Sequence, residues 1–446
     1  MSIIDLIISG CKVFYKNQLI EASIAIDSGK IVKIGKESLM PKAVKKLKYP
    51  KAIAIPGIID VHVHLRDQQL SYKETFETGT KAAAMGGITT VLDMPNNSPI
   101  TNSTETLNER MKLARNKIYV NVGFYSALPT RIEKIENIIK AGAIGFKLNL
   151  CRPIGDFNVD DDDLIIEALK ILKKHDFPIS IHAEDKQTVN NLEEHWRKIN
   201  LQDPEILIKT HPPEAEIKSV MRMIGLAKKV GAKIHFAHIS TADAVKMISE
   251  NKELITCEVT PHHLYLTQEK VKQFKGIAIM EPPLRTKRDL EVLWKGIGEG
   301  WIDIIASDHA PHTLNEKVSS NIWSIKPGIP GLETMLPLML TAVNQNRISL
   351  KKIIELMCIN PSKIFKLKNK GKIEEGYDAD ITIIDLNIER KINSSKFKSK
   401  AKYTPFEGFK VKGAPIATIV SGELVAEYDE VIKPAGKIIR SCEVHS

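Results

Sequence analysis

Two histidines in the segment DVHVHLR, His62 and His64, are spaced so that they can act together. Their apolar, β-branched neighbours favour a strand, and side chains at positions i and i+2 of a strand point to the same side. The two imidazoles should therefore converge on one point. Such a pair, joined by other ligands, is typical of a site for zinc or a similar divalent cation that performs hydrolysis.

Other apolar segments end in residues that could complete this site. PISIHAE carries His182, KIHFAHI carries His238, and DIIASDHA carries Asp308. A single histidine at the end of a strand is usually structural, but several at matching ends favour a shared metal site. Seven other histidines are expected to have no such role, because they lie on an opposite strand face, in a structural segment or in contact with solvent: His235, His262, His263, His175, His195, His211 and His445.

Lys147, in the segment IGFKLNL, is the unusual member of the set. An ammonium group cannot coordinate a metal, and its charge would be costly among metal-bound imidazoles. Carboxylation by carbon dioxide would turn it into an anion that can bridge two cations. We therefore expect Lys147 to be a carboxylated metal ligand.

The elements that must position these residues alternate between strand and helix. Eight apolar segments predict strands, and helical patterns such as DDDLIIEALKILKKH separate most of them. This order predicts an α/β fold, a (β/α)8 TIM-like barrel, whose active site lies at the carboxyl ends of the strands. The predicted strands are 58–65, 89–95, 119–127, 144–150, 178–184, 233–239, 256–260 and 303–310.

Both ends of the chain lack this alternation of strand and helix and consist of short β-rich segments and turns. We expect residues 1–57 and residues 371–446 to form one small β-rich domain. The barrel is then expected to span residues 58–370.

Composition narrows the class of protein. The chain has 446 residues, 43% of them apolar, but its apolar stretches have the length of strands and not of membrane spans. The first residues, MSIIDLIISG, lack the basic region of a signal peptide, and the five cysteines form no C-x-x-C pair. These features predict a cytoplasmic protein without disulfides.

The net charge of +10 could suggest a nucleic-acid partner. The densest basic run, RKINSSKFKSKAK, lacks interleaved aromatic residues and favours a solvated loop. We therefore expect neither a nucleic acid nor a membrane as a partner. The excess of cations is better suited to attracting a small anionic substrate.

Taken together, the motifs resemble the amidohydrolase superfamily and, within its cyclic amidases, the dihydroorotases. The segments that carry the resemblance run in family order over nearly the whole chain: PGIIDVHVHLRD, GFKLNL, ISIHAED, IHFAHIST, CEVTPHH, PPLR, ASDHAPHT and PGIPGLETMLPLML. The resemblance implies reversible hydrolysis of (S)-dihydroorotate to N-carbamoyl-L-aspartate, a step of pyrimidine biosynthesis. It also leaves a homodimer or homotetramer open.

The resemblance further implies a role for each site residue. His62, His64 and Asp308 would hold one zinc ion, or another divalent ion, and His182 and His238 a second. Carboxylated Lys147 would bridge the two ions, which would share the attacking hydroxide, and Asp308 would act as the acid and base. The substrate carboxylate would be bound by Arg66, Asn96 and His312.

One residue departs from the family pattern. Glu281 stands before PPLR, where many relatives have asparagine, and this puts one substrate contact in doubt. We expect its carboxylate to turn away from the substrate and to pair with Arg285 or a nearby lysine.

Two alternatives to dihydroorotase remain open. One is a sister cyclic amidase with the same metals, either an allantoinase or a dihydropyrimidinase of the hydantoinase type. Arg66 and the segment MPNN favour dihydroorotase, because they suit a ring that bears a carboxylate. The other is a non-catalytic relative that serves as an assembly partner, which the complete ligand set argues against.

Overall fold

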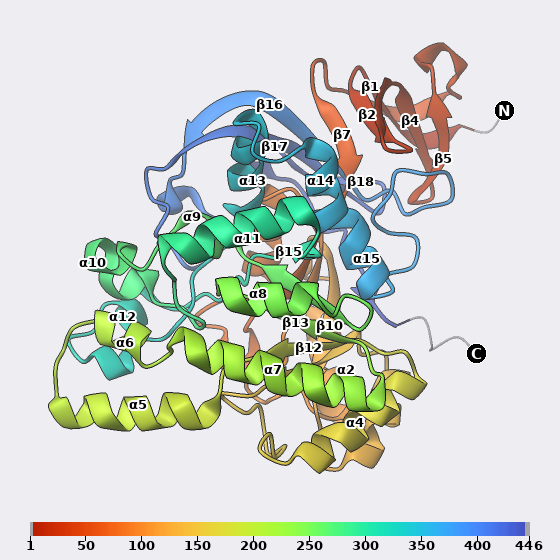
Figure 1. Ribbon diagram of the computed structural model, residues 1–446. Coiled ribbons are helices and arrows are strands. Elements are labelled where there is room, and N and C mark those ends of the chain that lie inside the picture. The colour runs from red at the N-terminus through yellow and green to blue at the C-terminus, as the bar shows by residue number, and fades with distance from the viewer. Residues whose placement is uncertain (1–2, 442–446) are drawn as a thin grey trace.

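Eight strands pair in chain order as a parallel sheet that curls into a barrel (Figure 1). The computed structural model describes residues 3–441, and the predicted fold class is confirmed. An isolated parallel bridge between Val63 and His309 joins the last strand segment to the first. The strands are β8 (Ile58–Val63), β9 (Ile88–Asp93), β10 (Asn121–Ala127), β11 (Gly145–Asn149), β12 (Ile179–His182), β13 (Ile234–Phe236), β14 (Ile255–Val259) and β15 (Ile304–Ile305).

The eighth strand is shorter than predicted. Residues 303–310 were expected to form a strand, but β15 ends at Ile305. Asp308 has a φ of 44°, which a strand cannot accommodate. The chain therefore leaves the ladder and regains contact with the first strand one residue later, where the backbone N–H of His64 donates to the carbonyl of His309.

Helices cover the outside of the barrel, and their apolar faces form its outer core. In α4, for example, Asp161 caps the first turn by accepting from the N–H of Leu164, and the apolar residues of the helix point inward. The main helices are α1 (Phe76–Met85), α2 (Thr104–Ala114), α3 (Ile135–Lys140), α4 (Asp162–Lys174), α5 (Lys186–Ile199), α7 (Pro213–Val230), α8 (Ala242–Ser249), α11 (Lys287–Glu299) and α13 (Met335–Asn344).

Both ends of the chain contribute strands to a β-rich domain beside the barrel, as predicted (Figure 1). One sheet has the order β5 (Lys30–Gly35), β4 (Ser23–Asp27), β1 (Ile4–Ser9) and β6 (Ala43–Lys48). The other has the order β19 (Glu430–Val431), β18 (Glu423–Glu427), β17 (Lys410–Val420), β16 (Ile381–Lys391), β7 (Ile53–Pro56), β2 (Lys12–Tyr15) and β3 (Gln18–Glu21).

The β-rich domain and the barrel are joined through a close contact at Gly57. This residue connects β7 to β8, and a Cβ atom there would lie 2.1 Å from Oγ1 of Thr89 on β9. Only glycine fits such an approach. At the other end of the chain, β20 (Ile438–Ile439) leaves the β-rich domain and pairs with β10 of the barrel.

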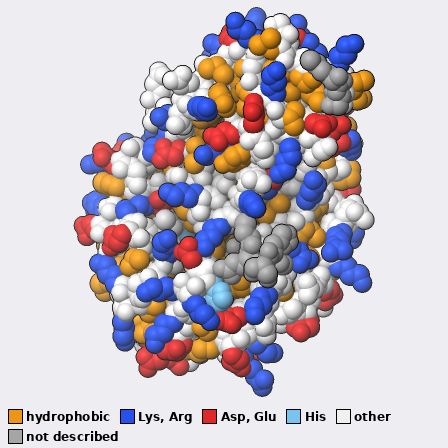
Figure 2. Space-filling model, turned by 90° about the vertical axis from the view of Figure 1, so that its right-hand side faces the viewer, with side chains coloured by type: hydrophobic (Ala, Val, Ile, Leu, Met, Phe, Trp, Pro, Cys, Tyr) orange, Lys and Arg blue, Asp and Glu red, His pale blue; other side chains and the backbone are white. Residues whose placement is uncertain are grey.

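The surface carries charges of both signs. Figure 2 shows Lys and Arg side chains interspersed with Asp and Glu over the face that it presents. On this face, positive charge is therefore not gathered into one patch. No helix of the described residues is long and apolar enough to cross a membrane.

Candidate metal centre and substrate cavity

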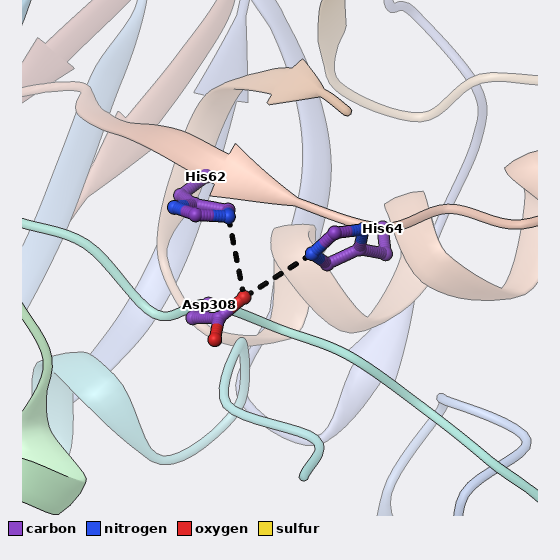
Figure 3. A group of neighbouring side chains, drawn as sticks. All are labelled: His62, His64 and Asp308. Atoms are coloured by element: carbon purple, nitrogen blue, oxygen red, sulfur yellow. Dashed lines mark hydrogen bonds and ion pairs between the residues drawn. The ribbon is translucent and has the colours of Figure 1, made fainter. Parts of the chain in front are cut away.

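His62 and His64 converge on one carboxylate at the carboxyl end of β8 (Figure 3). Oδ1 of Asp308 lies 3.4 Å from Nε2 of His62 and 3.2 Å from Nε2 of His64. Asp308 reaches this point from the segment after β15. The spacing of the two histidines therefore does what the strand geometry predicts, and the chain supplies an acidic third member.

His182 and His238 form a second pair beside the first. His182 ends β12 and His238 follows β13, and Nδ1 of His182 lies 3.1 Å from Nε2 of His238. The rings of His62 and His238 are 5.1 Å apart between centroids, so the two pairs are neighbours. Burial is the first cause that lowers the pKa values of His62, His64 and His238. These imidazoles are thus neutral, as metal ligands must be.

Three oxygen acceptors fix the imidazoles in one orientation. Nδ1 of His62 lies 2.5 Å from Oε1 of Glu258, and Nδ1 of His64 lies 2.7 Å from Oδ1 of Asn96. Nε2 of His182 lies 2.8 Å from Oε2 of Glu184. Each of these nitrogens must donate, because the oxygens accept, so the opposite nitrogen of each ring keeps its lone pair for the centre.

Two kinds of separation fit a metal ion: those from Nε2 of His62 and His64 to Oδ1 of Asp308, and that from Nδ1 of His182 to Nε2 of His238. Four ligands about 2.0 Å from a zinc ion in a tetrahedral arrangement lie about 3.3 Å from one another. The observed separations are 3.1, 3.2 and 3.4 Å. His62, His64 and Asp308 could therefore hold one cation, and His182 and His238 could contribute to another.

Lys147 lies between these groups without a partner. Its strand, β11, places the side chain in the same cavity, and its Nζ is buried with no hydrogen bond to any described residue. Burial lowers the pKa of Lys147 to about 8. A buried amine is normally paired, so the lone Nζ marks a place where a further group is expected.

The centre opens into a cavity of about 110 Å³. Arg66 and Asn96 line it, and Arg66 is buried, with its Nε donating to the carbonyl of Pro311. His312 lies behind Arg66 and is not among the lining residues. Nδ1 of His312 accepts from Lys73, and its Nε2 donates to the carbonyl of Pro327. The cavity therefore offers a guanidinium and an amide to an anionic group.

The expectation for Glu281 is wrong in its partners. Its carboxylate lines the cavity, and Oε1 lies 3.3 Å from Nε2 of His211 and 3.9 Å from Nη2 of Arg152. Arg285 instead donates to Oγ of Ser240 and to the carbonyl of His211. Burial acts to raise the pKa of Glu281, but the charges of His211 and Arg152 outweigh it, so the pKa falls below its usual range.

The expectation that His211 is solvated is also wrong, since it is 3% exposed. It precedes α7 and contacts the two carboxylates of Glu184 and Glu281. His175 and His195 lie on helical surfaces, and His445 lies outside the described residues. His263 is structural, as expected, because it contacts Thr260 and the carbonyl of Pro282.

Glu258 and Glu184 were missed in the sequence. Both are fully buried, and each binds a histidine of the centre. The signal that could have revealed them is an acidic residue in or beside a segment that is otherwise apolar, CEV for Glu258 and ISIHAE for Glu184. A buried carboxylate is costly without a partner, so each implied a donor nearby. His235 is such a donor, 3.2 Å from Oε2 of Glu258.

Comparisons with known proteins agree with this geometry. A family model described as "Amidohydrolase family" matches residues 53–425. A dihydroorotase of Pyrococcus horikoshii is 39% identical over 446 aligned positions, covering 98% of this chain and 96% of the relative. A dihydroorotase of Methanosarcina acetivorans is 36% identical, covering 97% of this chain and 94% of the relative.

A solved structure is similar over the same extent. The L-hydantoinase (dihydropyrimidinase) from Arthrobacter aurescens has a TM-score of 0.94 and 30% sequence identity to this chain. The match covers 98% of this chain and 100% of that structure.

Proposed function

Since this chain belongs to the amidohydrolase family, we propose that it is a dihydroorotase, a hydrolase of cyclic amides. The reaction is the reversible hydrolysis of (S)-dihydroorotate to N-carbamoyl-L-aspartate. Relatives named dihydroorotase align over nearly the whole chain. The observation that carries the substrate assignment is Arg66, a buried guanidinium on the wall of the cavity, because the ring of dihydroorotate bears a carboxylate.

The cofactor that fits the centre is a pair of divalent cations, zinc in the first place. His62, His64 and Asp308 would hold one and His182 and His238 the other. Bound cations supply two kinds of chemistry, a lower pKa for water and polarisation of the amide carbonyl.

Carboxylated Lys147 would complete the centre as a bridge between the two cations. Its buried Nζ has no hydrogen-bond partner among the described residues and faces the cavity that the imidazoles line. A carboxylate on this nitrogen would place two oxygens where the centre now has only nitrogens and Asp308. It would also replace a cation, which disfavours bound metal, with an anion, which favours it.

Asp308 is the residue best placed to move a proton. Its Oδ1 faces both imidazoles of the first pair. Its Oδ2 makes no hydrogen bond to a described residue, and the side chain lines the cavity. A carboxylate in this place can accept the proton of the attacking water and deliver it to the ring nitrogen that leaves.

Arg66 and Asn96, which line the cavity beside the candidate metal ligands, are the residues proposed to bind the substrate. Arg66 can form a bidentate pair with the ring carboxylate. Asn96 uses its Oδ1 to hold His64, which leaves its amide N–H groups to donate to the substrate. His312, the third residue of the predicted carboxylate site, lies beside Arg66, with its Nε2 3.3 Å from Nη2 of Arg66. That nitrogen donates to the carbonyl of Pro327, so it does not accept from the guanidinium.

A second candidate is a hydantoinase or dihydropyrimidinase activity. The likeness to the Arthrobacter aurescens enzyme favours it, since nearly the whole of both chains superposes. Substrates of that kind lack the ring carboxylate, however, and would leave the Arg66 guanidinium without a partner. An allantoinase activity has the same metals and is tested together with it.

The deciding experiment compares three substrates on the metal-loaded protein. Conversion of dihydroorotate is followed in a spectrophotometer, with allantoin and dihydrouracil as controls. We expect dihydroorotate to be used with by far the largest kcat/KM. A preference for either control would overturn the substrate assignment, and no turnover of any of the three would favour the non-catalytic assembly partner.

A further inference from the structure

His211 forms a bridge between the buried carboxylate of Glu184 and the partly exposed carboxylate of Glu281. Its Nδ1 lies 3.1 Å from Oε1 of Glu184, and its Nε2 lies 3.3 Å from Oε1 of Glu281. Carboxylates can only accept hydrogen bonds, so the ring must donate from both nitrogens. The geometry thus requires an imidazolium with a negative charge on either side.

The electrostatics of this place agree with that charge state. Burial acts to lower the pKa of His211, but the charges of Glu184 and Glu281 outweigh it and raise the pKa to about 10. Two cationic side chains lie at the ends of the bridge. Nη2 of Arg285 is 3.8 Å from Glu184, and Nη2 of Arg152 is 3.9 Å from Glu281.

Each carboxylate of the bridge leads to a different part of the site. Oε2 of Glu184 accepts from Nε2 of His182, which directs Nδ1 of that ring toward His238. Glu281 lines the cavity itself. One imidazolium therefore touches the group that orients a candidate metal ligand and a group on the wall of the cavity.

A metal ion of its own is a less suitable explanation for this cluster. Sγ of Cys151 lies near Glu184 and His211, and the three atoms could in principle surround a cation. Both ring nitrogens of His211 are already within hydrogen-bonding distance of carboxylates, and Arg285 places a positive charge beside Glu184. The cluster is occupied by protons and a guanidinium, and it has no need of a metal.

We propose that His211 is a positioning residue, a double donor that holds Glu184 against His182 and Glu281 in the cavity wall at the same time. The expected effect of His211 on KM for dihydroorotate rests on the proposed function. Its expected effect on metal affinity does not. The loop between α6 (Glu205–Lys209) and α7 contributes no candidate metal ligand. The positioning role explains why this loop nevertheless carries a buried histidine.

The variant His211→Gln tests the proposal, because glutamine carries no charge and its two N–H groups leave from one nitrogen, so it cannot reproduce the donors on either side of the imidazolium ring. We expect the affinity for metal, measured by competition with a chromogenic chelator, to fall about 10- to 100-fold, as is typical when the partner of a ligand histidine is disturbed. We also expect KM for dihydroorotate to rise more than kcat falls. His175→Gln is the matched control, since His175 contacts Glu136 outside the centre.

A second variant guards against a simple loss of folding. His211→Gln combined with Glu281→Gln removes one positive and one negative charge. Glu184 then no longer competes with a second carboxylate for the introduced amide donor, and it keeps Arg285 as its other partner. We expect this double variant to regain metal affinity while KM stays raised. Metal affinity and KM that match the wild type in both variants would overturn the proposal, as would a loss of metal affinity that His175→Gln shares.

The measurement of metal affinity tests the positioning role of His211 even if the proposed function is wrong. A wild-type protein that binds two cations but does not convert dihydroorotate would refute the function alone. Unchanged metal affinity in His211→Gln, with dihydroorotate converted normally, would refute the positioning role alone.

Discussion

Three of the four imidazoles of the candidate centre divide their two nitrogens between separate tasks. In His62, His64 and His182, one nitrogen faces the centre and the other donates to an oxygen of Glu258, Asn96 or Glu184. This arrangement fixes the tautomer and the direction of the lone pair before any cation arrives. A ligand that is held in this way loses little side-chain entropy on binding metal.

The number of bound ions can be checked by replacing one member of the second pair. Purified protein should contain about two divalent ions per chain, the number of a two-metal site, and His182→Ala should lose at least one. Elemental analysis of protein dialysed against metal-free buffer measures this. His175→Ala serves as the control and should keep both. Fully active protein with a single ion would exclude the two-metal centre.

Arg66 tests the nature of the substrate. Lysine offers a point charge where arginine offers two parallel donors. For Arg66→Lys we expect kcat/KM for dihydroorotate to fall. The fall should correspond to a loss of about 1–3 kcal/mol in the free energy of transition-state binding, the range for charged hydrogen bonds. Steady-state kinetics measure this, and dihydrouracil, which lacks the carboxylate, should be affected less. An unchanged kcat/KM for dihydroorotate would remove the main support for a carboxylate substrate.

Lys147 tests the proposed bridge. Lys147→Ala should be nearly inactive, and a short carboxylic acid should restore part of the activity by filling the bridging position. Protein stripped of metal and carbon dioxide should recover best when both are returned. NMR with ¹³C-labelled bicarbonate should show a carbamate signal in the wild type and none in the variant. A free amine in active, metal-loaded enzyme would contradict the proposal.

At the scale of elements, the site depends on strand ends that the chain leaves in unusual conformations. Arg66, His238 and Asp308 have φ values of 55°, 34° and 44°. Such values are strained for residues other than glycine and occur mostly where the surrounding structure enforces them. Asp60 is part of that enforcement, because its Oδ1 accepts from the N–H groups of His62 and Ser307 and so ties β8 to the segment after β15.

A buried ion pair holds the end of β8 from another side. Asp93, at the end of β9, accepts from the N–H of Leu65 and from the guanidinium of Arg110 on α2. Both side chains of the pair are 1% exposed. These contacts give Asp93 a structural role.

Removal of Arg110 should therefore destabilise the protein and disturb the site. Arg110→Ala would leave Asp93 charged, buried and without its partner, which costs about 3–5 kcal/mol. Urea denaturation followed by circular dichroism measures this loss. Lys112→Ala is the matched control, because Lys112 is exposed on the same helix. A change in Arg110→Ala no larger than that of the control would show that the pair contributes little.

At the scale of the whole molecule, the candidate ligands come from five of the eight strands. They lie on or directly after β8, β11, β12, β13 and β15. A cation in the centre would therefore connect segments that are distant in sequence. Because an unfolded chain lacks the assembled site, metal binding should stabilise the native state.

Removal of metal should thus lower the thermal stability. At free metal about 100 times the dissociation constant, binding contributes about 2.7 kcal/mol. Scanning calorimetry before and after chelation should show a lower Tm in the stripped protein, and return of the metal should reverse it. The His182→Ala protein should respond less. A Tm that is the same with and without metal would argue against a centre that spans the barrel.

The sequence by itself determined a large part of this protein. The spacing of His62 and His64, together with a strand pattern of period two, was sufficient to predict that both rings reach one point. The alternation of strand and helix predicted the barrel, and the barrel predicted that residues such as His182, His238 and Asp308 meet at one end. These inferences succeed because they depend on local periodicity and on a rule for parallel strands.

Only the tertiary structure decided which groups stand behind the ligands. Glu258 is 196 residues from His62, and His211 is 27 residues from Glu184. Even for Glu184, only two residues after His182, local patterns do not reveal which donor meets which acceptor. For Glu281, the sequence showed that a carboxylate there needs a cation, but it did not show which one. The packing of the loop before α7 against the cavity decided in favour of His211. A buried charge must be paired, and the fold alone determines the partner.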